Sequence, residues 1–173
     1  LVGPPDDPAS VLSSPLIEVA VQRIVKHRAR FVSRGDESGT HTRERQLFTL
    51  AGVTLFPEQT VVSGQGMSRT LRLASELEAY TLTDAATFMA MNQVLCLQPV
   101  FQGGTNLLNT YSVISSTMNP NEASRADTRS LVGWLTDGGG RELIKGFGLS
   151  SGLPAFTVWP LGSPRDQPGD LPF

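Results

Sequence analysis

The sequence predicts an α/β fold, because a unit of short apolar strand, polar glycine-containing turn and helix occurs twice. The first unit spans residues 31–51 and the second spans residues 60–78. In the second, Met67, Leu71 and Ala74 recur at the spacing of one buried helix face. Such repetition is typical of an α/β layer in which both helices begin at the same edge of the sheet.

Size and charge narrow the classes of function. The chain has 173 residues, of which 39% are apolar and 17% charged, so we expect one domain or two small lobes that share a crossover. The 14 basic and 16 acidic residues give a net charge of −2, and without a basic excess we expect no nucleic-acid partner. An anion would then be bound by local geometry rather than by a general positive field.

Three features bear on cellular context. No apolar run reaches the length of a transmembrane helix, so we expect a protein that does not span a membrane. Leu1 stands first without a basic-then-apolar leader, so we expect a processed chain or a fragment that shows no signal peptide. The single cysteine, Cys96, excludes an internal disulfide, and its apolar neighbours predict a buried thiol.

The other elements follow from apolar spacing and from helix and turn signals. Helices are predicted at residues 15–25, 40–51, 67–78, 85–91, 123–135 and 141–147, and further strands at residues 80–83, 94–100, 111–115 and 155–159. Ser13 or Ser14 is the expected N-cap of the first helix. Leu131 and Trp134 are expected to face inward. The glycine- and proline-rich residues from Gly148 predict an extended arm.

The first turn concentrates what an anion-binding site needs. The apolar pair Phe31-Val32 leads into a polar turn and then directly into a helix. Arg34 offers a fork of donors to two oxygens of a tetrahedral anion, and Ser38 and Thr40 offer hydroxyls. The amides of residues 38–40 stand at a helix start, where the helix dipole adds partial positive charge. The turn therefore predicts a site for a small oxyanion.

An ordinary structural role for the same residues stays open. Ser38 would serve only as an N-cap. Arg34 would then pair with Asp36 or Glu37 at the surface and bind no ligand.

The second turn, residues 63–68, is expected to present another helix start to the same cleft. Gly66, Met67 and Ser68 are its candidate contacts with the anion. The alternative is a plain glycine-rich loop, in which Ser68 and Arg69 cap the helix or form salt bridges.

Other chemistries lack the patterns they need. Ser38 with Asp36 and His41 does not match the nucleophile elbow, which places one residue between glycine and serine. His27, His41 and Cys96 have no zinc-site spacing, and the chain has no phosphate-binding Gly-Lys-Ser/Thr motif. We therefore expect no catalytic residue, no bound metal ion and no cofactor.

Four blocks of the sequence resemble a known family. The segment 31–41, Gly64-Gln65-Gly66-Met67 and residues 79–84 closely resemble the signature of the tungstate-binding periplasmic proteins of ABC importers. Val2-Gly3-Pro4 with residues 6–9 is similar to that family's crossover segment, and the blocks occur in the family's order. The resemblance implies a three-layer α/β/α type II periplasmic-binding-protein fold, whose two lobes close on the ligand.

The resemblance also implies a ligand and its contacts. Arg34 would clamp the oxyanion beside Ser33, while Ser38, Gly39 and Thr40 donate from the helix start. The implied ligand is tungstate or molybdate. The implied partner is an ABC permease if the source is bacterial, and the implied location is periplasmic or extracellular.

The chemistry of the ligand agrees with such a site. Tungstate and molybdate are fully ionised dianions near neutral pH, so neutral donors and one arginine suit them. Phosphate still carries a proton and would gain from a carboxylate acceptor. We expect Asp36 and Glu37 to turn outward or to brace Arg34.

The resemblance finally implies how the chain is divided. Residues 1–8 would form a crossover strand, residues 9–84 a complete second lobe, residues 85–147 the return crossover with part of the first lobe, and residues 148–173 the arm. The family has a further segment before the first crossover that reaches the other side of the ligand, and we expect this chain to lack it. The alternative function is a secreted domain that kept the fold for adhesion or another interaction without transport.

Overall fold

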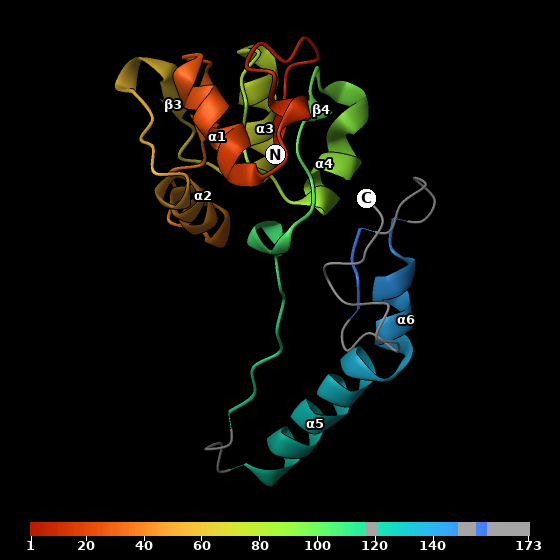
Figure 1. The fold of residues 1–173 in the computed structure, drawn as a ribbon. Helices are drawn as coiled ribbons and strands as arrows, with labels where there is room; N and C mark the ends of the chain where they lie inside the picture. Colours follow the sequence, from red (N-terminus) through yellow and green to blue (C-terminus); the bar gives the residue numbers. More distant parts are fainter. Residues whose placement is uncertain (117–120, 149–154, 159–173) are drawn as a thin grey trace. The chain divides into compact units, whose positions relative to one another are not determined.

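The computed structural model describes residues 1–116, 121–148 and 155–158. The described residues up to Leu108 form one compact unit, and those from Asn109 form another. The helices and strands, labelled in Figure 1 where space allows, are β1 Val2–Gly3, α1 Ile17–Lys26, β2 Phe31–Ser33, α2 Gly39–Leu50, β3 Thr60–Val62, α3 Met67–Glu76, α4 Ala85–Met91, β4 Gln98–Pro99, α5 Glu122–Thr136 and α6 Gly139–Gly146. The lobe boundaries expected at residues 9, 85 and 148 stay a prediction.

The strands of the first compact unit form two short ladders that single bridges join. β2 and β3 are parallel, with Phe31 opposite Thr60, and β1 runs antiparallel to β4. Bridges from Tyr80 to Phe31 and from Thr81 to Val2 connect the two ladders. The predicted strand at 80–83 is thus reduced to these two bridged residues.

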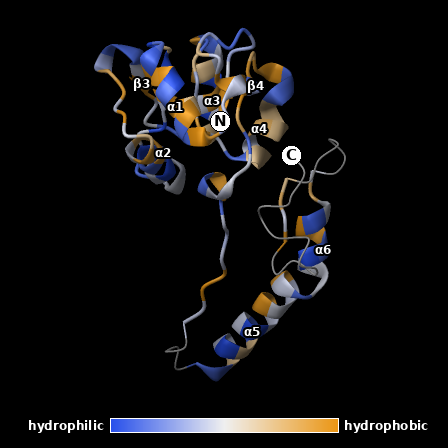
Figure 2. Ribbon diagram, in the orientation of Figure 1, coloured by the Kyte–Doolittle hydropathy of each residue, from blue (hydrophilic) through white to orange (hydrophobic). Residues whose placement is uncertain are grey.

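Helices cover both faces of this sheet. Phe31 packs in a core cluster with residues of α1 and α2, including Ile24 and Leu47. Its neighbour Val32 points to the other face and packs in a second cluster with Leu71 of α3. In Figure 2, α2 is coloured mostly as hydrophilic, in keeping with its polar N-terminal end. Helices on two faces of a sheet form the three-layer α/β/α arrangement expected from the sequence.

Tyr80 ties the first residues of the chain to the middle of the sheet. Its fully buried hydroxyl donates to Asp7 Oδ1 at 2.7 Å and accepts from the Ala9 amide at 3.0 Å. Burial raises the pKa of Tyr80, and the Asp7 carboxylate beside it raises this pKa further. A Cβ on Gly3 would lie 2.4 Å from Tyr80 Cδ1, so only glycine fits against this ring.

The first helix begins later than the sequence predicts. Its N-cap is Leu16, which makes no side-chain capping hydrogen bond. The prediction that Ser13 or Ser14 caps this helix is therefore wrong. The residues before the helix are wound differently, because Asp7 accepts from the amides of Val11 and Leu12 and holds them in a separate short turn.

The predicted strand at 94–100 shrinks to Gln98–Pro99, and the predicted burial of Cys96 is wrong. Asn92–Val94 winds into a short 3₁₀ helix instead of extending. Cys96 is exposed, and its amide donates to Ser75 Oγ at 2.7 Å. An apolar run indicates burial only where a neighbouring element covers it, and the side chain of Leu97, not that of Cys96, points into the core.

In the second compact unit the helices are confirmed but their packing differs. Leu131 and Trp134 are exposed rather than inward-facing. Trp134 rests against the start of α6, where a Cβ on Gly140 would lie 2.5 Å from its ring.

Two strands predicted for this unit are not formed in its described residues. The segment 111–115 lacks a sheet partner within the described ranges and exposes Ile114, so the predicted strand there is wrong. The described part of the segment 155–159, residues 155–158, is not a strand either. Most of the predicted arm, residues 149–154 and 159–173, lies outside the described residues.

Replacing the buried hydroxyl of Tyr80 provides a test of this core. We expect Tyr80→Phe to lower the free energy of unfolding by about 1–3 kcal/mol, because the Ala9 amide and Asp7 lose a buried partner. Urea unfolding measures the change. The control is Tyr111→Phe, which removes the same atom from a side chain that is 71% exposed. Equal losses in the two variants would contradict the role given to Tyr80.

Candidate functional site

The two turns meet at one edge of the sheet because β2 and β3 are parallel. The Ser63 amide donates to the Ser33 carbonyl and the Gly64 amide donates to the Arg34 carbonyl, both at 2.9 Å. α2 and α3 begin a few residues beyond these bonds. The predicted placement of both helix starts at the carboxyl ends of neighbouring strands is therefore confirmed, and this edge is where α/β proteins bind ligands.

The first turn is held in shape by its own side chains. Ser38 is the N-cap of α2, and its hydroxyl accepts from the His41 amide at 3.3 Å. The Ser38 amide donates to Asp36 Oδ1 at 3.2 Å. The amides of Gly39 and Thr40, the first two helical residues, have no acceptor within the helix. This leaves two backbone donors at the positive end of the helix dipole.

Arg34 is braced by a carboxylate, as expected. Its Nε donates to Asp36 Oδ2 at 2.8 Å, and its Nη1 donates to Thr40 Oγ1 at 3.4 Å. Hydrogen bonds from the hydroxyl and the amide of Ser38, and after them the charge of Arg34, hold the pKa of Asp36 below its ordinary value. Glu37 turns outward, with its side chain 78% exposed. The cap and the ion pair of the alternative interpretation are thus both present, and they orient Arg34 and the helix start.

A buried acid lies behind this turn, and sequence reasoning missed it. Glu44 of α2 is only 5% exposed, and its Oε2 accepts from the Arg34 amide at 3.2 Å. Burial raises the pKa of Glu44, while the Ser33 hydroxyl and the Arg34 amide oppose this rise by hydrogen bonding. The sequence did contain one indication that Glu44 is buried. It lies three residues before Leu47, and therefore on the same, buried face of the helix.

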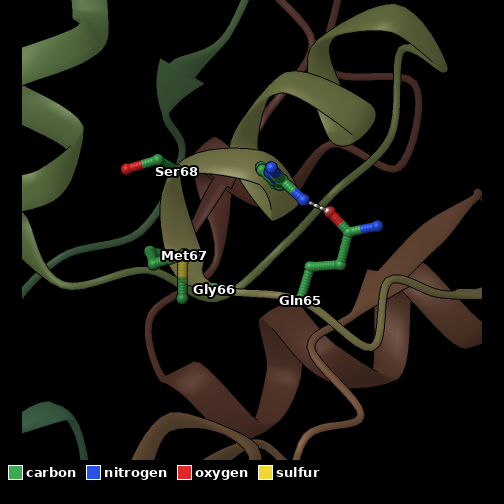
Figure 3. Close-up of a pocket in the computed structure, with 5 residues that line it drawn as sticks. Gln65, Gly66, Met67 and Ser68 are labelled. Atoms are coloured by element: carbon green, nitrogen blue, oxygen red, sulfur yellow. Dashed lines mark hydrogen bonds between the residues drawn. The ribbon is translucent and has the colours of Figure 1, made fainter.

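The second turn lines an open hollow of about 340 Å³ (Figure 3). Arg69 Nη1 donates to Gln65 Oε1 at 3.2 Å across its rim, and the Ser68 side chain points the other way. The Met67 side chain is buried in the second core cluster, and Met67 also lines the hollow. Gly66 is the N-cap and carries no capping side chain.

Hydrolytic and metal chemistry find little support in the described residues. The backbone amide of His41, not its ring, contacts Ser38, while His41 Nδ1 accepts from the Glu37 amide at 3.1 Å. No group of three or more His, Cys, Asp or Glu side chains in the described part of the chain is placed to hold a metal ion. Within the described ranges, no helix combines the length and apolar character needed to cross a membrane.

A family model described as a PBP (periplasmic-binding-protein) superfamily domain matches residues 1–137. The chain belongs to this superfamily. TupA of Peptoclostridium acidaminophilum, a tungstate-binding protein, is 34% identical over 161 residues, covering 91% of this chain and 56% of that protein. The chain spans about half the length of the curated relatives it matches.

Solved structures agree with membership of the PBP superfamily. The tungstate-binding protein TupA from Desulfovibrio alaskensis G20 matches with a TM-score of 0.71 and 32% identity, over 84% of this chain and 61% of that one. The tungstate ABC transporter structure from Geobacter sulfurreducens matches with a TM-score of 0.57 and 41% identity, over 59% of this chain and 44% of that one. The predicted α/β periplasmic-binding-protein-like fold is therefore confirmed.

The close approach of the two turns can be tested with a matched pair of glycine substitutions. Gly35 and Gly64 both have φ of +62°, but a Cβ on Gly35 would lie 2.3 Å from Val62 Cγ1, whereas one on Gly64 meets no atom within 4 Å. We expect Gly64→Ala to cost about 1 kcal/mol for the left-handed backbone. Gly35→Ala should cost about 1–3 kcal/mol more, because the Val62 side chain must move out of its present position. Equal costs in chemical denaturation would contradict this contact.

The buried carboxyl of Glu44 predicts how stability varies with pH. Because its pKa is raised above the ordinary 4.5 in the folded protein, the folded state binds this proton more tightly than the unfolded chain does. The resulting stabilisation is complete below the unfolded pKa and is lost as pH rises through the folded one. Relative to Glu44→Gln, wild-type stability should therefore fall as pH rises above 4.5.

Urea unfolding across this pH range measures the effect. Glu37→Gln, at an exposed carboxyl of the same turn, is the control and should keep the wild-type trend. If Glu44→Gln shows the same dependence of stability on pH as the wild type, the dependence belongs to another titratable group.

Proposed function

We propose that the chain is the anion-binding part of a solute-binding protein that takes up tungstate for an ABC importer, without catalysis. The observation that carries this is the turn at 34–40, where one guanidinium, two hydroxyls and two helix-start amides lie together at the sheet edge. Relatives that align with most of the chain are named as tungstate-binding proteins, which supports the ligand class.

The donor set suits a dianion that can only accept hydrogen bonds. Arg34 has five N–H donors, two of which are used by Asp36 and Thr40, so donors remain for an anion. We assign Ser33, Ser38, Gly39 and Thr40 as its neighbours in binding.

The carboxylates of the turn favour the same ligand class. The two oxygens of Asp36 are already engaged by Arg34 and Ser38, and Glu37 faces solvent. Neither is therefore left as an uncommitted acceptor for the O–H group of a protonated anion such as hydrogen phosphate. Molybdate has the same shape and charge as tungstate, and we propose it as a second ligand of this site.

The second turn is proposed to contribute from the other helix start. The amides of Met67 and Ser68 are the first two of α3, where the helix offers no acceptor, and both residues line the hollow. Because Gly66 has no side chain, a ligand can approach its backbone closely. The importer and a periplasmic location belong to the proposal, because the chain spans only 56% of the P. acidaminophilum relative.

Calorimetric titration of the full-length protein with sodium tungstate tests the function. We expect binding in the wild type and a loss of about tenfold to a hundredfold in Arg34→Ala, because a hydrogen bond to a charged group is worth about 1.5–3 kcal/mol. Arg45→Ala is the matched control: it removes the same charge from an exposed position of α2 and should change affinity little. Absence of heat with tungstate and molybdate, or an Arg34→Ala variant that binds like the wild type, would refute the proposal.

A further inference from the structure

Among the described residues, Glu44 is the only acidic or basic side chain that is buried. It lies directly behind the two residues that open the proposed site. One carboxyl oxygen accepts from the Arg34 amide at 3.2 Å, and the carboxyl also interacts with the Ser33 hydroxyl, which is itself buried. A buried carboxyl in contact with a proposed ligand residue is able to affect binding without touching the ligand.

The Ser33 hydroxyl has one proton, so it can donate in only one direction. While Glu44 is ionised, this proton is directed to the carboxylate, so Ser33, a proposed ligand residue, has only oxygen lone pairs left for an anion. Those lone pairs repel an oxyanion that can only accept. When Glu44 carries a proton, the carboxyl donates to Ser33, and the Ser33 proton is free to bond the anion. The Arg34 amide bond to Oε2 is compatible with both states when Oε1 is the oxygen that carries the proton.

We propose that Glu44 is a positioning residue that sets the direction of the Ser33 hydroxyl, so that binding of a fully ionised tetrahedral dianion takes up one proton at Glu44. This inference rests on the oxyanion-binding function proposed above. The proton comes from solvent and stays on the protein, and no covalent bond to the ligand forms. The dianion and the protonated acid favour each other, because each stabilises the same orientation of Ser33.

Charged groups of both signs surround Glu44. His41, one turn earlier on α2, favours the ionised acid, and Asp36 in the preceding turn disfavours it. Residues 60–67, which include β3 and the second turn, carry no titratable side chain. α1, which packs against α2, carries charged side chains at Glu18, Arg23 and Lys26. A bound dianion adds negative charge beside Glu44 and therefore favours its protonated form.

Titration of the full-length protein with sodium tungstate from about pH 6 to about pH 9 tests the coupling. Wild-type affinity should weaken with rising pH by up to about tenfold per pH unit, the limit for one proton taken up. Repeating the calorimetry in buffers of different ionisation enthalpy should reveal uptake of up to one proton. Glu44→Gln, whose amide donates to Ser33 and accepts from the Arg34 amide, should lose this slope and bind more tightly than the wild type at the alkaline end.

Two further variants separate the mechanism from simpler effects. Glu37→Gln removes an exposed carboxylate of the same turn and should keep the wild-type slope. Ser33→Ala removes the hydroxyl through which Glu44 acts and should reduce the slope as well as the affinity. A slope that persists in Glu44→Gln, or one that is undiminished in Ser33→Ala, would overturn the inference. If tungstate binds but its affinity does not vary with pH, the proton coupling is overturned and the proposed function stands. If tungstate does not bind at any pH, the proposed function itself is overturned.

Discussion

The parallel pairing of β2 with β3 is the constraint on which the proposed site depends. Because both strands point the same way, their carboxyl ends reach one edge, and the helix after each begins there. Two amide–carbonyl bonds, from Ser63 to Ser33 and from Gly64 to Arg34, extend the pairing into the turns themselves. Two helix N-termini then face the same region without any net positive charge on the chain. The proposed anion binding would therefore depend on backbone orientation more than on basic residues.

The acids near the turn are arranged so that none offers a free carboxylate to the site. Asp36 is engaged by Arg34 and Ser38, Glu37 faces solvent, and Glu44 lies buried behind Ser33. Each position has a different energetic consequence. Asp36 orients the guanidinium and stays ionised, Glu37 is screened by water, and Glu44 has a desolvated carboxyl that favours its proton. The proposed site would therefore consist of neutral donors and one arginine, with the three carboxyl groups held away from a bound anion.

Much of the fold was predictable because its signals are local. The helix start at Ser38 and the helix capped by Asp84 follow from residues a few positions apart, and the structure confirms both caps. Errors arose where a distant segment decides the outcome. Cys96 sits in an apolar run but is not covered by another element, and the segment 111–115 alternates but lacks a partner strand in the described chain. Neither circumstance is encoded in the neighbouring residues.

The sequence by itself determined the two strand–turn–helix units and the donors of the first turn, because cap preferences and backbone freedom act within one turn of chain. Only the tertiary structure decided how those donors are supported. Arg34 was visible as a candidate, but its brace on Asp36 was one of several open pairings. Glu44 was not identified at all, because a polar helix start looks solvated in sequence. It becomes buried only when α2 folds back against β2 and its carboxyl meets the Arg34 amide.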